Sequence, residues 1–176
     1  YETFGEFDSA EELNMAAANQ KKEGDKVALV ALAKENGIDE DDATDFFEGN
    51  VPELCSELMA AEGKIRVEKE YLGLTEALED YADWIVKECM EDEALCKAVR
   101  KKGKSLAGAL GAVLKKAWEI KEDIHEDILK AAGIHATVKN GSPGMRTTTK
   151  LMRDYYLGGN QDAKKNSKFT VEQDIY

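Results

Sequence analysis

The feature that most constrains the fold is an apolar periodicity at i, i+3 and i+4 spacing, which glycines interrupt at intervals along the chain. Ala, Leu, Glu and Lys recur throughout the 176 residues, and only two residues are proline. These residue types favour helices, and a glycine directly after an apolar stripe is a common helix end. The sequence therefore predicts an all-α fold of about seven to nine short helices, with at most minor β structure.

One predicted helix has the cleanest apolar stripe of the chain, and we expect it near the centre of the larger helical part. Leu110 and Leu114 should be almost fully buried, and Trp118 should be at least partly buried. Gly108 and Gly111 lie beside the stripe and should let another backbone approach closely. The stripe consists of Leu106, Ala109, Leu110, Val113, Leu114 and Ala117.

Charge divides the chain into an acidic first third and a larger remainder. Residues 1–62 contain 17 acidic and 4 basic residues, whereas residues 63–176 contain 19 acidic and 20 basic residues, and the net charge of the chain is −12. We expect an acidic helical N-terminal subdomain over residues 1–62, packed on a larger helical C-terminal part over residues 63–159. A polar tail over residues 160–176 follows.

The connection between these two parts is predicted from proline and glycine. A helix is expected to begin at Pro52, because proline is favoured in the first turn of a helix. Residues 62–73, around Gly63 and Gly73, are expected to form a hinge with a short strand over Ile65–Val67.

A run of acidic residues marks one predicted helix of the N-terminal subdomain. Asp39 and its neighbours resemble the start of a calcium-binding loop, but Thr44 stands where an EF-hand needs glycine and Asn50 where it needs glutamate. Acids in the first turn of a helix also complement its positive end, which is a structural explanation of the run. As a binding surface, the acids are expected to contact a basic partner. They are Asp39, Glu40, Asp41, Asp42, Asp45 and Glu48.

A basic cluster lies in the middle of the chain. Residues 95–121 contain eight Lys or Arg residues and a single acid, Glu119. Clustered cations between two helices can bind phosphates, but cations at a helix C-terminus are also favoured by the helix dipole. The alternatives are therefore a nucleic-acid contact through the basic region 97–121 and an ordinary solvated turn. The residues expected to make such a contact are Arg100, Lys101, Lys102 and Lys104.

The sequence contains no recognisable catalytic or metal-binding motif. It has no GxxxxGK[ST], GxSxG or GxGxxG pattern, and its two histidines have no partners at metal-ligand spacing. The three cysteines lack CxxC spacing, which favours a reducing cytoplasm over a disulfide framework. No apolar run approaches the roughly 18 residues of a membrane span. We therefore expect a cytoplasmic, non-enzymatic protein without cofactor, metal or membrane contact; a metal-dependent hydrolase with dispersed carboxylates is the less favoured alternative.

Three short parts of the chain carry a family resemblance. They are Thr3-Phe4-Gly5-Glu6-Phe7-Asp8-Ser9 with Glu12-Leu13-Asn14, the turn Glu35-Asn36-Gly37-Ile38, and Asp154-Tyr155-Tyr156-Leu157-Gly158-Gly159. Together they resemble type II anti-CRISPR proteins, which phages and other mobile elements of gut anaerobes carry. Proteins of this family inhibit the RNA-guided effector nuclease of a CRISPR system.

The resemblance implies a stoichiometric binding protein without catalytic residues. Its implied partner is a CRISPR effector nuclease in the bacterial host cell, with the guide RNA or target DNA of that nuclease as further partners. Because such effectors hold nucleic acid in basic channels, an acidic surface can occupy a channel as a nucleic-acid mimic. The alternative function is a nucleic-acid-binding accessory protein of a mobile element, which would use the basic region.

Overall fold

The computed structural model describes residues 3–158 of the chain. Within them, nine helices and one two-stranded antiparallel sheet form a predominantly helical fold, which confirms the predicted fold class. The N-terminal unit contains α1 (Ala10–Glu23), α2 (Lys26–Glu35) and α3 (Glu40–Glu48). The body contains α4 (Glu57–Leu72), α5 (Glu76–Cys89), α6 (Glu93–Arg100), α7 (Leu106–Glu119) and α9 (Met145–Leu157). The arm contains β1 (Glu122–Asp123), α8 (Glu126–Ala131) and β2 (Lys139–Asn140).

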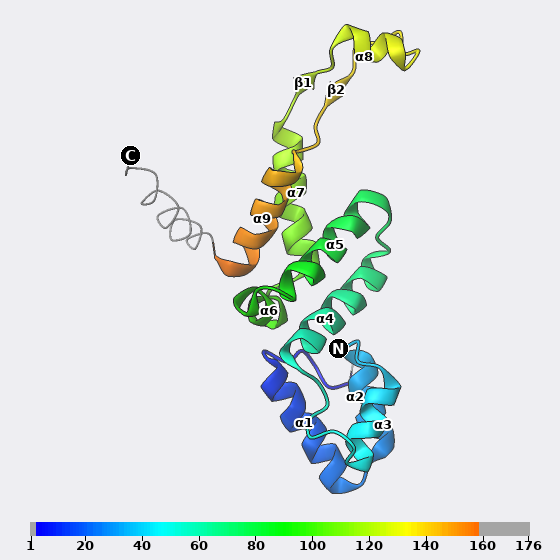
Figure 1. Cartoon of the computed structure of the whole chain (residues 1–176), viewed down its shortest axis with the longest axis vertical. Helices are drawn as coiled ribbons and strands as arrows, with labels where there is room; N and C mark the ends of the chain where they lie inside the picture. Colours follow the sequence, from blue (N-terminus) through cyan, green and yellow to red (C-terminus); the bar gives the residue numbers. More distant parts are fainter. Residues whose placement is uncertain (1–2, 159–176) are drawn as a thin grey trace, which may run out of the picture.

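The molecule is elongated, with the N-terminal unit at one end and the arm at the other (Figure 1). The two strands of the arm pair antiparallel, with Glu122 opposite Asn140 and Asp123 opposite Lys139. In the described residues, no helix has the length and apolar character needed to cross a membrane. The predicted tail over residues 160–176 lies outside the described residues.

Short polar side chains begin several of the helices. Ser9, Ser56 and Ser105 each accept a hydrogen bond from a backbone N–H three residues further on, which satisfies one of the free amides at a helix N-terminus. The helices α1 and α3 end at Gly24 and Gly49, whose φ angles of 74° and 84° favour glycine. Local sequence therefore sets where these helices begin and end.

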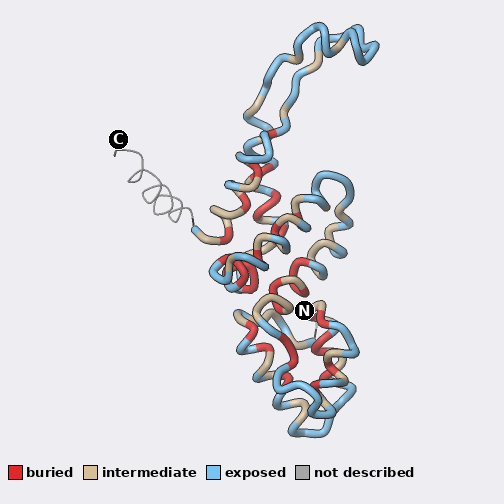
Figure 2. The backbone as a smooth tube through the Cα atoms, viewed as in Figure 1, coloured by how far each residue is buried: buried red, intermediate tan, exposed pale blue. Residues whose placement is uncertain are grey.

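Residues 3–158 form two hydrophobic cores along the length of the molecule (Figure 2). One core lies between α1, α2, α3 and the start of α4, and includes Leu29. The other lies between α4, α5, α6, α7 and α9, and includes Ile85. The helix α4 belongs to both, because Ala60 packs in the first core and Ala61 in the second. The boundary expected after residue 62 therefore falls inside a continuous helix.

The predicted hinge over residues 62–73 and the predicted strand over Ile65–Val67 are wrong, because these residues lie within α4. Pro52 lies in a bend before α4 and does not begin a helix. Gly63 serves a close contact instead: a Cβ at this position would lie 2.2 Å from the backbone oxygen of Asn36. The glycine thus allows α4 to approach the turn after α2, and does not break the helix.

The helix α7 is buried along only part of its predicted stripe. Leu110 is 8% exposed, as predicted, but Leu114 is 68% exposed and Trp118 is 82% exposed, so their predicted burial is wrong. The reason is the length of α7, whose last turns extend past the body towards the arm (Figure 1). An apolar stripe is buried only where a neighbouring element covers it.

The two glycines of α7 have different surroundings. A Cβ on Gly108 would lie 2.1 Å from the hydroxyl oxygen of Tyr155, so the missing side chain makes room for a ring of α9. The backbone N–H of Ser105 donates to the same hydroxyl oxygen at 3.1 Å, which ties the start of α7 to α9. Gly111 would have nothing within 4 Å of its Cβ, so the close approach expected there is wrong.

Candidate functional site

The acidic residues expected to bind a partner lie on α3 and at its N-cap. We call the set Asp39, Glu40, Asp41, Asp42, Asp45 and Glu48 the α3 acidic face. Ala43 and Phe46 of the same helix are buried in the N-terminal core, and this sets the helical phase. Asp42 is half-buried, and the other five acids are exposed. The first-turn acids also lie at the positive end of the helix dipole, so their positions carry no electrostatic penalty for the helix.

Basic residues from neighbouring helices compensate part of this charge. The ion pairs are Lys34 with Glu40 (2.7 Å), Arg66 with Asp39 (2.9 Å) and Lys26 with Glu48 (3.5 Å). Because Lys34 hydrogen-bonds to it, the carboxyl of Glu40 has a pKa below its usual value. Asp41 and Asp45 are exposed and make no ion pair with another described residue. They are therefore the acids most available to a cationic partner.

The basic cluster is only partly accessible. Arg100 is fully buried, so the nucleic-acid contact expected of its guanidinium is wrong for this structure. The ammonium of Lys104 donates to the backbone oxygen of Tyr155 at 2.6 Å and lies 4.9 Å from the centre of that ring. Lys101 and Lys102 are exposed. Half of the expected contact residues thus serve the packing of the protein itself.

Arg100 belongs to a buried polar junction between the N-terminal unit and the body. Its guanidinium donates to the side-chain oxygen of Asn36, which is also fully buried, at 2.6 Å. Lys64 of α4 is fully buried, and its ammonium lies 2.8 Å from the carboxylate of Glu6 and 2.8 Å from the backbone oxygen of Lys101. The backbone oxygen of Arg100 is a third acceptor at 3.5 Å. Three acceptors match the three N–H donors of a lysine, so the buried charge is satisfied.

Sequence reasoning missed this junction, although a signal for it exists. Lys64 follows Ala60 and Ala61 at helical spacing, so it occupies the apolar side of α4. A lysine in phase with buried alanines indicates a buried cation only when the helix itself has been recognised. The glycines at both ends of residues 62–73 favour a hinge there, and a hinge has no helical phase from which burial could be predicted.

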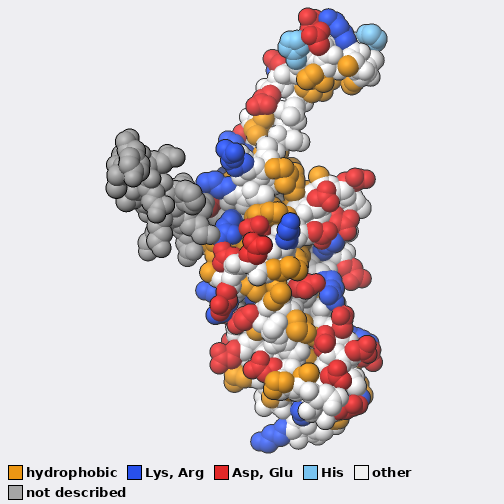
Figure 3. Space-filling model, viewed as in Figure 1, with side chains coloured by type: hydrophobic (Ala, Val, Ile, Leu, Met, Phe, Trp, Pro, Cys, Tyr) orange, Lys and Arg blue, Asp and Glu red, His pale blue; other side chains and the backbone are white. Residues whose placement is uncertain are grey.

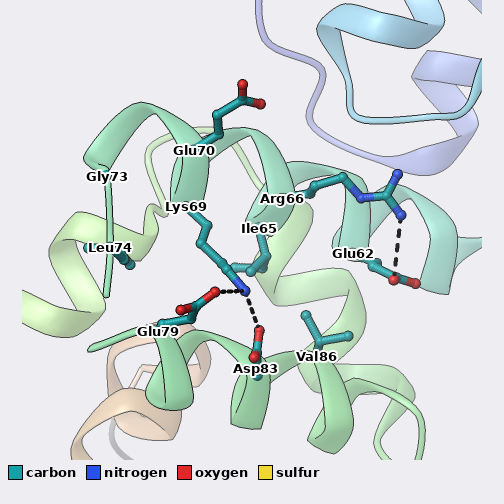
Figure 4. A pocket seen from close by; sticks show the side chains of 10 residues that line it. All are labelled: Glu62, Ile65, Arg66, Lys69, Glu70, Gly73, Leu74, Glu79, Asp83 and Val86. Atoms are coloured by element: carbon teal, nitrogen blue, oxygen red, sulfur yellow. Dashed lines mark hydrogen bonds and ion pairs between the residues drawn. The ribbon is translucent and has the colours of Figure 1, made fainter. Parts of the chain in front are cut away.

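A pocket of about 510 Å³ lies between α4 and α5 (Figure 4). Lys69 lies 3.0 Å from the carboxylate of Glu79 and 2.7 Å from that of Asp83, and Arg66 lies 3.6 Å from Glu62. The hydrogen bonds to Asp83 and Glu79 hold the pKa of Lys69 above its usual value. The two ion pairs of Lys69 join α4 to α5, and all charged side chains of the lining except Glu70 take part in ion pairs with other lining residues.

Two further features of the described residues are the arrangement of metal-ligating side chains and the reactivity of the cysteines. In residues 3–158, no group of three or more His, Cys, Asp or Glu side chains is placed to hold a metal ion. The three cysteines are free thiols, and each is buried. Burial raises the pKa of the Cys55 thiol to about 12, so it is a weak nucleophile at neutral pH.

The two charged surfaces therefore differ in availability. The α3 acidic face is exposed to solvent, whereas the basic cluster contributes Arg100 and Lys104 to contacts inside the protein.

Comparisons of the chain with protein-family models, with curated proteins and with solved structures found no match.

Proposed function

We propose that this chain is a non-enzymatic inhibitor that binds a CRISPR effector nuclease and blocks its binding or cleavage of nucleic acid. The partner class follows from the resemblance of the sequence to type II anti-CRISPR proteins. The observation that carries the proposal is the set of exposed carboxylates of the α3 acidic face. The helix α3 lies at the end of the molecule remote from the arm (Figure 1), and acidic side chains are seen on the surface at that end (Figure 3). A surface of this kind fits a basic protein channel.

The spacing of the carboxylates supports mimicry of a nucleic-acid backbone. Asp41 and Asp45 are one helical turn apart, which is about 6 Å along the helix axis. One strand of duplex DNA rises about 3.4 Å per nucleotide and carries one negative charge per nucleotide, so this spacing corresponds to two phosphates of one strand that have a third phosphate between them. Effector nucleases hold their guide–target heteroduplex in a positively charged channel. A helix with this spacing can therefore occupy part of such a channel in place of phosphates.

The test is a cleavage assay with a purified type II effector, its guide RNA and a labelled target DNA. The inhibitor is added in increasing amounts, either before or after the guide RNA and before or after the target. We expect cleavage to disappear near one inhibitor per effector, because a binding protein acts stoichiometrically. Undiminished cleavage across a panel of type II effectors at micromolar inhibitor would refute the proposed function.

A pair of variants tests the surface. The first variant changes all six residues of the α3 acidic face to Asn or Gln. A matched control removes the same number of charges from exposed acids of the body and arm. The control residues are Glu70, Glu76, Asp80, Glu91, Glu119 and Glu122.

We expect the face variant to lose inhibition and the control variant to retain it. Circular dichroism and urea unfolding should show both variants folded, because exposed charges contribute little to stability. If both folded variants inhibit equally, or if both lose inhibition equally, the α3 acidic face is not the contact. A gel shift of free DNA by the unmodified protein at low salt would favour the nucleic-acid-binding alternative instead.

A further inference from the structure

An apolar groove of about 370 Å³ lies between α5 and α7 at the base of the arm. Its edges carry Leu78, which is 46% exposed, together with Leu114 and Trp118, which are 68% and 82% exposed. We call it the arm-base groove. The side chains that line it are apolar, apart from the hydroxyls of Tyr81 and Ser142.

The tip of the arm carries a second uncovered apolar surface. The helix α8 has no buried residue, and its Ile128 is 62% exposed. Ile134, just after α8, is 42% exposed. The space-filling view shows hydrophobic side chains both at the tip and where the arm joins the body (Figure 3).

The arm holds its own tip away from its own groove. The backbone N–H of Ile124 donates to the backbone oxygen of Val138 at 3.3 Å, and Lys139 pairs with Asp123 at 2.8 Å. These contacts join the two strands, so the tip projects from the body (Figure 1). No residue of α8 lines the groove. Within residues 3–158, the groove is therefore left open to the arm tip of another molecule.

We propose that the arm-base groove is occupied by the arm tip of a second copy of this chain, in a symmetric dimer that exchanges arms. In such a dimer, each copy contributes one tip and one groove, and a two-fold axis relates the two identical contacts. Ile128 and Ile134 of one copy cover Leu78, Leu114 and Trp118 of the other. The inference does not depend on the proposed function.

The available surface agrees with this occupant. Stable interfaces bury about 800 Å² per partner, and a reciprocal exchange needs only about half of that from each of its two contacts. A buried Trp contributes roughly 150–250 Å², and Trp118 is 82% exposed before association. The exchange uses both uncovered apolar surfaces at once, whereas a dimer formed by two grooves alone would leave both tips exposed to water.

The test measures the mass of the full chain in solution by sedimentation velocity over a range of about 1–100 μM. Three double variants keep the fold, because each replaces exposed side chains by Gln. The groove variant is Leu114→Gln with Trp118→Gln, and the tip variant is Ile128→Gln with Ile134→Gln. The control is Val27→Gln with Tyr71→Gln, at residues that are 81% and 88% exposed and lie outside the groove and the tip.

We expect a dimer of the unmodified chain and of the control. The groove variant and the tip variant should each raise the dimer dissociation constant by about tenfold or more, because apolar anchors dominate such interfaces. An equimolar mixture of the two variants, one of them labelled with a fluorophore, should form a mixed dimer in which one of the two contacts is intact. That rescue is specific to a reciprocal exchange.

Three results would overturn the proposal. The first is an unmodified chain that stays monomeric over the whole concentration range. The second is a dimer that the tip variant leaves unchanged, since the grooves would then meet each other directly. The third is the absence of mixed dimers when the groove and tip variants are combined.

Discussion

The polar junction and the arm-base groove differ in the side chains that they bury: charged side chains are buried at the junction, whereas apolar side chains are exposed at the groove. At the junction, Lys64 and Arg100 are fully buried and hydrogen-bonded to groups from other elements. At the groove, Leu114 and Trp118 are mostly exposed. The difference follows from where helices converge: α2, α4 and α6 meet at the junction, whereas α7 extends past its neighbours. Residue type alone does not decide burial here, so we expect junction changes to affect folding and groove changes to affect association.

The largest expected effect is at Gly63 in the junction. Replacing it with Ala would place a Cβ 2.2 Å from the backbone oxygen of Asn36, and a backbone atom cannot move aside cheaply. We expect Gly63→Ala to lower the free energy of unfolding by about 3 kcal/mol or more, as measured by urea denaturation. Stability within about 0.5 kcal/mol of the unmodified protein would contradict the close contact.

The second-largest loss of stability is expected from replacing Lys64, the buried cation of the junction. Changing Lys64 to Met keeps much of the side-chain volume but leaves the carboxylate of Glu6 without its ion pair. We expect a loss of about 2 kcal/mol, because the backbone oxygens of Arg100 and Lys101 lose their donor, whereas the carboxylate of Glu6 is partly exposed and can be hydrated. The control is Arg66→Met two residues away, whose pairs with Asp39 and Glu62 are exposed. That change should cost about 0–1 kcal/mol, and equal losses in the two variants would show that burial is not the cause.

An intermediate effect is expected at Asp92, which caps α6 and pairs with Arg153 of α9. Burial alone would raise the pKa of Asp92, but hydrogen bonds from Arg153 and from the backbone of Leu95 and Ala94 hold it below the usual 3.8. Asp92→Asn keeps a helix-capping acceptor and removes the charge. We expect it to cost about 1 kcal/mol at pH 7.

The pH dependence of that loss checks its cause. A carboxyl whose pKa is lowered by folding stabilises the protein above its unfolded pKa, and this contribution disappears as the pH falls through the folded pKa. The difference in unfolding free energy between the unmodified protein and the Asp92→Asn variant should therefore shrink below about pH 4. A difference that stays constant down to about pH 2.5, well below the unfolded pKa, would assign the loss to capping or packing instead.

The smallest expected change in the free energy of unfolding is an increase, and it concerns a glycine of α7. Gly111→Ala adds a methyl group into open space and removes a flexible residue from a helix interior. We expect it to raise the free energy of unfolding by about 0.5–1 kcal/mol, measured at one low protein concentration. Gly108→Ala on the same helix should be destabilising, because its Cβ would meet the Tyr155 ring. Equal effects at the two positions would contradict the packing of α9 against α7.

Helix starts and ends were predictable where the signal is local. Ser9 and Ser105 cap α1 and α7 through hydrogen bonds within one helical turn, and the glycines after α1 and α3 end those two helices. The burial of Leu110 follows from the periodicity of its stripe. The outward position of the α3 acidic face follows from the phase that Ala43 and Phe46 impose. Its function as a binding surface stays a prediction.

The incorrect predictions have a different physical origin, because they concern contacts between elements that are distant in the sequence. Gly63 looked like a helix break because glycine has low helix propensity, yet α4 continues through it, since packing against the turn after α2 outweighs that propensity. Leu114 continues a regular stripe but is exposed, because no sequence pattern states how far a neighbouring helix extends. Arg100 looked like part of a surface cluster, because three lysines follow it within four residues.

The sequence by itself determined the helical class, many of the helix boundaries and the unequal distribution of charge, since these depend on residues within one or two helical turns. Only the tertiary structure decided which charges are buried and which apolar residues remain exposed. The partners of Arg100 and Lys64 illustrate the reason: Asn36 lies 64 positions before Arg100, and Glu6 lies 58 positions before Lys64. Contacts over such separations form only when distant helices pack together, so no local pattern in the sequence specifies them.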